Sequence, residues 1–189
     1  MIPASAPVTA QDFEELLRSG ERWLDLAGGR LIRLEPPDEQ HGNVVFNLSK
    51  AVAAYLRKHR EAVACFDVGL WLSREPDTIH CPAMCCFKSS DRFTEVDKLV
   101  SESRPELVVE IGSTADRREG LRDRLADYRA AGVPTVWVID TVTQHVHQHL
   151  PEGRPQMLKQ QDVLTGEPVL PGFSIPVPQL FADPPWVVR

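Results

Sequence analysis

Two apolar segments on either side of an amphipathic segment restrict the fold of this chain most strongly. Residues 106–111 are Glu-Leu-Val-Val-Glu-Ile, and residues 136–140 are Val-Trp-Val-Ile-Asp. Apolar runs of this length are typical of strands buried on both faces, as in parallel sheets. Successive parallel strands are joined by a right-handed crossover, usually a helix. The sequence therefore predicts an α/β fold with a β-α-β unit at its centre.

The segment between these strands has the signals of the crossover helix. Ser113 and Asp116 have the spacing of a capping box at its start. Gly132, followed by Pro134, marks its end, because glycine suits the left-handed position after a helix and proline cannot continue it. The predicted buried stripe recurs at positions i, i+4 and i+7: Leu121, Leu125 and Tyr128.

Glu110 is a charged residue inside the first apolar strand. Burying an unpaired carboxylate costs roughly several kcal/mol, so a metal ion, a cation or a strong donor is expected beside it. α/β proteins place their sites at the carboxyl ends of parallel strands, where Glu110 lies. Arg124 shares the edge of the helical stripe that faces the sheet, and its guanidinium is expected to reach towards Glu110. Glu110 is therefore the first candidate functional residue.

Length and charge narrow the classes of protein. A chain of 189 residues predicts a single domain, residues 1–189, with a sizeable core. The net charge of -6 argues against a general electrostatic grip on nucleic acid. Five arginines lie between residues 117 and 129, but acidic residues alternate with them, and a solvated helix face is the favoured interpretation. Without a membrane-length apolar run or a secretory leader, the expected location is cytoplasmic.

The cysteines and a group of histidines carry weaker signals. The spacing of Cys81, Cys85 and Cys86 does not match a zinc site, so these residues and Cys65 are expected to be free thiols. Three alternate histidines project from one side of a predicted strand: His145, His147 and His149. They could bind a transition metal, but the favoured interpretation is the exposed face of an edge strand, with Val146 pointing inward.

The rest of the chain predicts short elements of mixed type. The patterns indicate a helix from Thr9 to Gly20, a hairpin with a turn at Gly28 and Gly29, and a long helix over 41–59. Further strands are expected over 62–66, over 69–72, ending at 84–87, and over 144–149, with a short helix inside the polar segment 89–103.

Several phrases, in order and spacing, resemble the Uma-two family of putative restriction endonucleases, a branch of the PD-(D/E)XK nuclease fold. The phrases cover nearly the whole chain: Asp25-Leu-Ala-Gly-Gly-Arg-Leu31, Pro37-Asp-Glu-Gln-His41, Leu107-Val-Val-Glu-Ile-Gly-Ser113, Tyr128-Arg-Ala-Ala-Gly-Val-Pro134, Val136-Trp-Val-Ile-Asp140 and Val169-Leu-Pro-Gly-Phe173. The resemblance implies a restriction-endonuclease-like mixed central sheet flanked by helices, with additional antiparallel strands. It also implies a hydrolase that cuts DNA with Mg²⁺ or Mn²⁺ held by carboxylates.

The family's site residues carry over only in part. Glu110 matches the motif glutamate, His41 matches a histidine at the start of the long helix, and Asp25 stands where relatives have a hairpin glutamate. The resemblance thus implies Glu110 and Asp25 as metal ligands. The motif aspartate falls at Ala83, which cannot bind a metal, and the motif lysine falls at Arg124, which cannot act as a base.

A Pro-Asp pair at Pro76 and Asp77 does not restore the missing ligand. Asp77 precedes Ala83 by six residues, or about 20 Å of extended chain. It also lies in a predicted turn.

Two functions from different classes remain. The first is a Mg²⁺- or Mn²⁺-dependent DNA endonuclease that uses Glu110, Asp25, Arg124 and His41, with a homodimer as the expected assembly of a double-strand cutter. The second is a catalytically inactive nuclease-fold module for binding or interaction, in which Glu110 pairs with Arg124. An enzyme of another class is less favoured, because the chain has neither a glycine-rich phosphate loop nor a serine nucleophile elbow.

Overall fold

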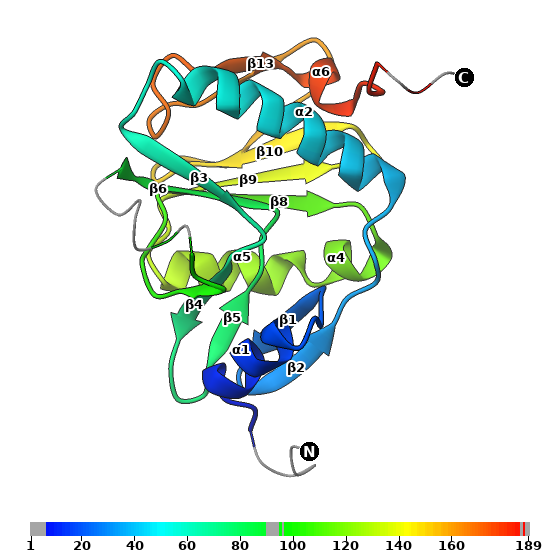
Figure 1. Cartoon of the computed structure of the whole chain (residues 1–189). Coiled ribbons are helices and arrows are strands. Elements are labelled where there is room, and N and C mark those ends of the chain that lie inside the picture. Colours follow the sequence, from blue (N-terminus) through cyan, green and yellow to red (C-terminus); the bar gives the residue numbers. More distant parts are fainter. Residues whose placement is uncertain (1–6, 90–94, 96, 186, 188–189) are drawn as a thin grey trace.

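A computed structural model describes residues 7–89, 95, 97–185 and 187. Its layers are visible in Figure 1: helix α2 (Glu39–Leu56) covers one face of a six-stranded sheet, and α4 (Ala115–Glu119) and α5 (Leu121–Ala130) cover the other face. A second sheet packs beyond α5. The predicted fold class, a mixed sheet flanked by helices with additional antiparallel strands, is confirmed.

The six-stranded sheet contains the predicted β-α-β unit. Its order is β11-β10-β9-β8-β6-β3. The strands are β11 (Gln156–Leu158), β10 (His145–His149), β9 (Thr135–Asp140), β8 (Leu107–Gly112), β6 (Met84–Lys88) and β3 (Ala62–Phe66). Strands β8 and β9 are parallel, and the other pairs are antiparallel. The central crossover therefore has the arrangement predicted from the two apolar runs.

Strand β8 is buried on both faces and directs Glu110 towards α5. Val109 and Ile111 join the core cluster that contains α2. Val108 joins the cluster that contains Tyr128 of α5. Because side chains alternate along a strand, Glu110 shares the face of Val108. A charge therefore enters the layer between the sheet and α5.

The second sheet supplies the other wall of that layer. Its order is β2-β1-β5-β4-β7, with β2 (Arg30–Arg33), β1 (Leu24–Ala27), β5 (Thr78–His80), β4 (Gly69–Ser73) and β7 (Val100–Ser101). Helix α1 (Ala10–Arg18) packs on it through Phe13, and Thr9 caps α1 in a capping box with Asp12. The predicted first helix and hairpin are confirmed.

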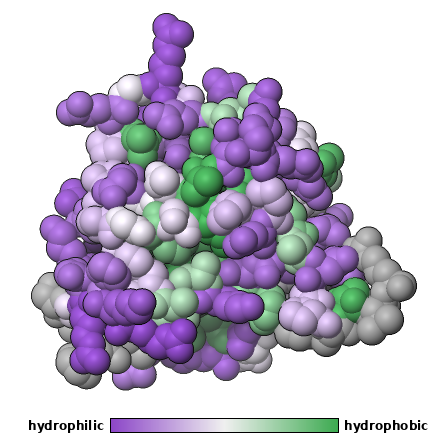
Figure 2. Space-filling model, turned by 90° about the horizontal axis from the view of Figure 1, so that it is seen from above, coloured by the Kyte–Doolittle hydropathy of each residue, from purple (hydrophilic) through white to green (hydrophobic). Residues whose placement is uncertain are grey.

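The C-terminal segment, residues 163–181, covers the outer side of α2. Strands β12 (Val163–Thr165) and β13 (Ser174–Pro176) pair with each other, and α6 (Val177–Phe181) packs against α2. Phe173 and Phe181 join this core. Hydrophilic residues surround smaller hydrophobic patches on this face in Figure 2.

Some local predictions are wrong. The capping box of Ser113 and Asp116 does not form: Thr114 is the N-cap residue, and Asp116 instead accepts hydrogen bonds from the Thr114 hydroxyl and from the backbone N–H of Glu35. The crossover helix also breaks at Gly120 into α4 and α5. Tertiary contacts to the loop before α2 override the local capping signal here.

The histidine strand differs from its prediction in one respect. Strand β10 lies between β9 and β11, so it is not an edge strand. Val146 is buried while its three neighbouring histidines are partly exposed, as the favoured interpretation requires. The four cysteines are free thiols, as predicted.

Two segments differ from their predicted extent or are only partly described. Residues 69–87, for which two strands are predicted, hold three: β4, β5 and β6. The short helix predicted within 89–103 falls largely on residues 90–94 and 96, outside the described part. No helix within the described part of the chain is long and apolar enough to cross a membrane.

Gly132 and Gly120 form a matched pair that tests how α5 ends. Gly132 follows α5 with φ +78°, whereas Gly120 has φ -75° and room for a Cβ atom. We expect Gly132→Ala to lower the free energy of unfolding by about 1 kcal/mol or more. Gly120→Ala should leave it unchanged or raise it by up to about 1 kcal/mol. Urea denaturation of both variants checks this, and equal effects would contradict the assignment of Gly132 as the helix-ending residue.

Candidate functional site

The buried guanidinium of Arg124 binds the carboxylate of Glu110 through two of its nitrogens. Arg124 Nε donates to Glu110 Oε1 at 3.0 Å, and Nη2 lies 2.7 Å from both Oε1 and Oε2. Both residues are 6% exposed. The predicted contact between α5 and the end of β8 is therefore confirmed. Bidentate pairing is the geometry in which arginine binds carboxylates most strongly.

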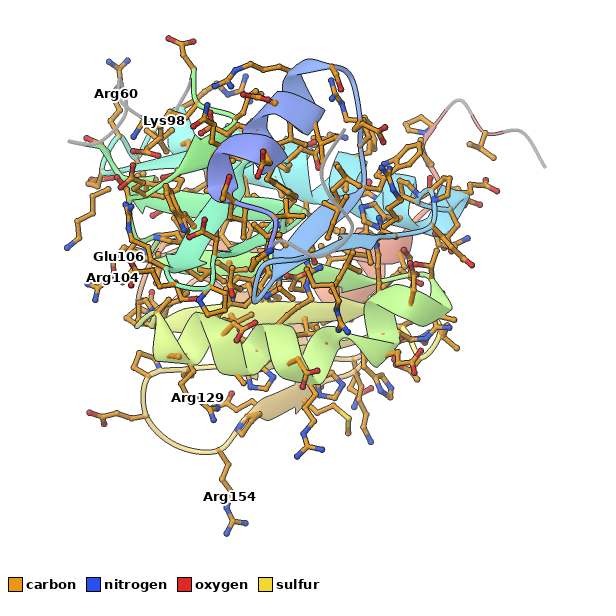
Figure 3. All side chains as sticks on the ribbon, turned by 90° about the horizontal axis from the view of Figure 1, so that it is seen from below. Arg60, Lys98, Arg104, Glu106, Arg129 and Arg154 are labelled. Atoms are coloured by element: carbon orange, nitrogen blue, oxygen red, sulfur yellow. The ribbon has the colours of Figure 1, made fainter. Side chains whose placement is uncertain are left out.

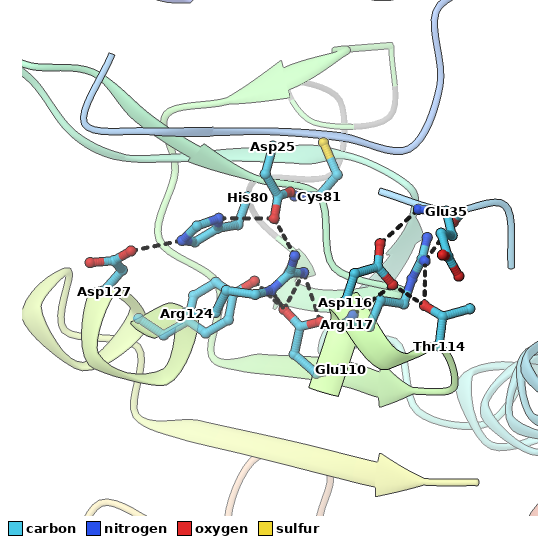
Figure 4. A network of polar contacts seen from close by, with 11 residues as sticks. Asp25, Glu35, His80, Cys81, Glu110, Thr114, Asp116, Arg117, Arg124 and Asp127 are labelled. Carbon is cyan, nitrogen blue, oxygen red and sulfur yellow. Dashed lines mark hydrogen bonds and ion pairs between the residues drawn. The ribbon is translucent and has the colours of Figure 1, made fainter. Parts of the chain in front are cut away.

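Asp25 of the hairpin is the second carboxylate on the same guanidinium. Arg124 Nη1 donates to Asp25 Oδ2, and the backbone N–H of Cys81 donates to Asp25 Oδ1 at 3.0 Å. Burial raises the pKa of Asp25, but the charge of Arg124 and the hydrogen bond from His80 outweigh it and hold the pKa below its ordinary value. Asp25 is therefore ionised at neutral pH. Figure 4 shows Asp25 and Glu110 on opposite sides of Arg124.

His80 extends this network to the surface, although no sequence pattern predicts its role. Its Nδ1 lies 3.3 Å from Asp25 Oδ2, and its Nε2 lies 2.8 Å from Asp127 Oδ2. Burial lowers the pKa of His80, but hydrogen bonds and charge from Asp25 and the bond to Asp127 raise it above its ordinary value overall. Both ring nitrogens therefore face carboxylates, as an imidazolium requires.

Tyr128 completes the surroundings of Glu110. Its hydroxyl donates to Glu110 Oε1, and the ring is fully buried. Burial raises the pKa of Tyr128 well above its ordinary value, and the neighbouring charge of Glu110 raises it further, so the phenol keeps its proton. Burial lowers the pKa of Arg124, but Glu110 and Asp25 raise it well above its ordinary value overall. We name the linked residues Asp25, His80, Glu110, Arg124, Asp127 and Tyr128 the ion cluster.

The ion cluster borders a cleft of about 370 Å³ between the hairpin, the start of α2 and the ends of β3 and β8. Besides Glu110 and Arg124, polar and aromatic side chains line it: Arg22, Trp23, His41, Phe46, Phe66, Asp67 and Arg117. We name this space the β8-end cleft. Its volume falls within the range of small-molecule sites.

His41 lies in this cleft, but its ring is held by Ser113. His41 Nδ1 lies 3.1 Å from the Ser113 hydroxyl. Burial and the charge of Arg117 lower the pKa of His41 to about 4, so its imidazole is neutral at pH 7. The cleft therefore brings together three of the four predicted site residues (Glu110, Arg124 and His41), and Asp25 reaches them through the ion cluster.

Ala83 also lines the cleft, next to a carboxylate that the sequence reasoning missed. The last antiparallel pair of β3 and β6 is Phe66 with Met84, and the residues just beyond this pair, Asp67 and Ala83, both line the cleft. Asp67 has φ +54° and an exposed side chain, and partial desolvation by its neighbours raises its pKa. Only the strand pairing reveals this proximity, because the two residues are 16 positions apart in the chain.

Asp77 has a structural role, as its predicted turn position suggested. Its carboxylate accepts hydrogen bonds from the backbone N–H of Ala10 at 2.8 Å and from Trp71 Nε1 at 3.2 Å. These bonds connect the turn after β4 to the start of α1. Asp77 is therefore already engaged away from the ion cluster.

The donor set does not fit a divalent metal ion in this arrangement. The two predicted ligands, Glu110 and Asp25, both bind Arg124, which supplies the positive charge that their burial requires. Across residues 7–89, 95, 97–185 and 187, no group of three or more His, Cys, Asp or Glu side chains is placed to hold a metal ion. A hard divalent ion prefers several oxygen ligands at once.

Comparisons with known proteins identify the family and the fold. Residues 10–178 match the model of the Uma2 family, described as "Putative restriction endonuclease". A crystal structure described as a putative nuclease belonging to DUF820, from Anabaena variabilis ATCC 29413, is similar with a TM-score of 0.74 and 16% sequence identity. The similarity covers 93% of this chain and 98% of that one. No curated protein matches.

Removing the arginine from the ion cluster should destabilise the protein strongly. Arg124→Met leaves two buried carboxylates without their cation, and we expect the free energy of unfolding to fall by about 3–5 kcal/mol. Arg122→Met, on the exposed side of the same helix, is the control and should change it by about 0.5 kcal/mol or less. Urea denaturation measures both variants, and equal effects would show that the cluster does not support the fold.

The raised pKa of His80 predicts how stability depends on pH. The folded protein binds the protonated ring of His80 more strongly than the neutral ring. The contribution of His80 to the free energy of unfolding is therefore complete below the ordinary pKa of 6.5, and it is lost as the pH rises through the higher pKa of the folded state. The difference in unfolding free energy between the unaltered protein and His80→Gln should therefore shrink with rising pH. Denaturation from about pH 5 to about pH 9 measures it. If the difference in unfolding free energy instead grows with pH, the folded protein does not favour the protonated form of His80. His145→Gln is the control variant.

Proposed function

Because this chain belongs to the Uma2 family, described as putative restriction endonucleases, we propose that it is a nuclease-fold protein that acts by binding rather than by metal-dependent cleavage. In this proposal Arg124 balances the carboxylate charges that a divalent ion balances in PD-(D/E)XK nucleases. The supporting observation is the contact of one guanidinium with both Glu110 and Asp25. The resemblance places the lost motif residues at Ala83 and Arg124.

The chemistry of the cleft supports a binding role. Arginine stays protonated in proteins, so Arg124 is unable to take a proton from an attacking water. Tyr128 holds its proton towards Glu110. The ring of His41 is directed to Ser113. The ion cluster therefore contains no residue that takes a proton from water, as the motif lysine does.

The second candidate is a Mg²⁺- or Mn²⁺-dependent DNA endonuclease, and the cleft favours it in one respect. Glu110, His41 and Asp67 line the same space as Arg117, and Ala83 lines it too. In this candidate the carboxylate of Asp67, directly after β3, replaces the one missing at Ala83, provided that Arg124 moves away. A homodimer belongs to this candidate, since two paired sites cut both strands of a duplex.

The charged residues labelled in Figure 3 are of mixed sign. Several cations lie on one side of the molecule, together with an acidic residue: Arg60, Lys98, Arg104, Arg129, Arg154 and Glu106. Lys98 pairs with Glu95 at 3.4 Å and Lys88 with Glu106 at 3.3 Å. With the net charge of -6, this arrangement favours a small ligand over the backbone of a duplex.

Calorimetric titration with Mn²⁺ separates the two candidates. The unaltered protein should show no saturable binding, because Arg124 already engages both carboxylates. A double variant, Ala83→Asp with Arg124→Lys, should gain binding, and adding Glu110→Ala should remove it again. Saturable Mn²⁺ binding by the unaltered protein, lost in Glu110→Ala and accompanied by DNA cleavage, would establish the endonuclease instead.

A further inference from the structure

The walls of the β8-end cleft carry two exposed aromatic side chains. Trp23 is 46% exposed and Phe66 is 37% exposed, and both line the cleft. Large apolar side chains are normally buried, and aromatic rings left open in a concave site are suited to stacking with a flat ligand. The apolar part of this cleft therefore matches a planar ring system.

Two residues that line the cleft, Trp23 and Asp67, have an uncommon backbone conformation. Trp23 has φ +56° and Asp67 has φ +54°. A bulky residue with positive φ is a genuine outlier, and such strain clusters at binding and catalytic sites. The carbonyl of Trp23 accepts a hydrogen bond from the N–H of Leu34 at 2.8 Å, which holds this conformation at the start of the hairpin. Trp23 is thereby kept at the rim of the cleft.

Two arginines, Arg22 and Arg117, line the cleft. Arg117 is half-buried and binds the carbonyl of Glu35 and the Thr114 hydroxyl through Nη1. Arg22 binds backbone carbonyls through its Nη1 as well. Both guanidinium groups stay positively charged, and they bring two cations to one opening. Paired arginines of this kind suit a phosphate group.

Asp67 offers an acceptor beside the aromatic side chains. It makes no hydrogen bond and no close ion pair within the part of the chain that the structure describes. Arg22 and Arg117 lie close enough to lower its pKa, although burial has the larger effect and raises it. A carboxyl group with this freedom accepts hydrogen bonds from amino groups of nucleobases, as acidic residues do from cytosine.

We propose that the β8-end cleft binds one nucleobase with its phosphate, with the base beside Trp23 and Phe66. Asp67 accepts a hydrogen bond from an exocyclic amino group, and Arg22 and Arg117 bind the phosphate. The volume of about 370 Å³ suits one nucleotide, and a base stacked within a duplex is unable to enter. The ligand is thus a free nucleotide or an unpaired nucleotide of a single strand. This inference rests on the proposed binding role of the same cleft.

Calorimetry with dGMP, dCMP and dTMP, without added metal, tests the inference. Saturable binding of dGMP or dCMP with weaker binding of dTMP is expected, since thymine has no amino group. Trp23→Leu should weaken binding by about tenfold, the loss of one base–aromatic stack. Asp67→Asn should remove the preference over dTMP, and Trp71→Phe, outside the cleft, is the control. Absence of nucleotide binding, or equal binding by Trp23→Leu and the unaltered protein, overturns the inference.

Two further comparisons identify the source of the ligand and separate this inference from the proposed function. Tighter binding of a short single-stranded oligonucleotide than of dGMP indicates an unpaired nucleotide, and equal affinity indicates a free one. Tighter binding of the matching duplex than of either overturns the inference. Nucleotide binding together with saturable Mn²⁺ binding rejects the proposed function alone. If the protein binds neither nucleotide nor Mn²⁺, the inference is rejected and the proposed function is not.

Discussion

The contact of one guanidinium with two buried carboxylates connects the main parts of this protein. Arg124 comes from α5, Glu110 from the central parallel strand and Asp25 from the second sheet, so a single cation joins both sheets through the helix between them. Removing Arg124 leaves both carboxylates buried without their cation. The packing of the layers and the chemistry of the cleft therefore depend on the same interaction.

The interaction also accounts for how the proposed binding protein would keep its fold stable without a divalent ion. Carboxylates that converge at the end of a strand repel each other and are costly to bury unless a cation lies between them. A guanidinium supplies one positive charge and several hydrogen bonds in a fixed geometry. Here His80 lies between Asp25 and Asp127, and these carboxylates raise its pKa above the ordinary value. The result is a compensated network that still borders an open cleft.

Much of the fold could be predicted, because its signals are local. The apolar runs predict β8 and β9, the helical pattern from Thr9 to Gly20 predicts α1, and Gly132 predicts the end of α5. The same reasoning predicted the pair of Glu110 and Arg124 from helical spacing. It missed His80 and Asp67, because their roles depend on pairing between distant strands. It placed a capping box at Ser113 wrongly, because Asp116 binds Glu35 far away in the sequence.

The most direct test of the central interaction is a crystal structure determined from crystals grown with Mn²⁺, with anomalous scattering measured at the manganese edge. The account predicts Arg124 in contact with both Glu110 and Asp25, and no anomalous peak between these carboxylates. A manganese peak bound by Glu110 and Asp25, with the side chain of Arg124 displaced, would contradict it and restore the metal-dependent nuclease.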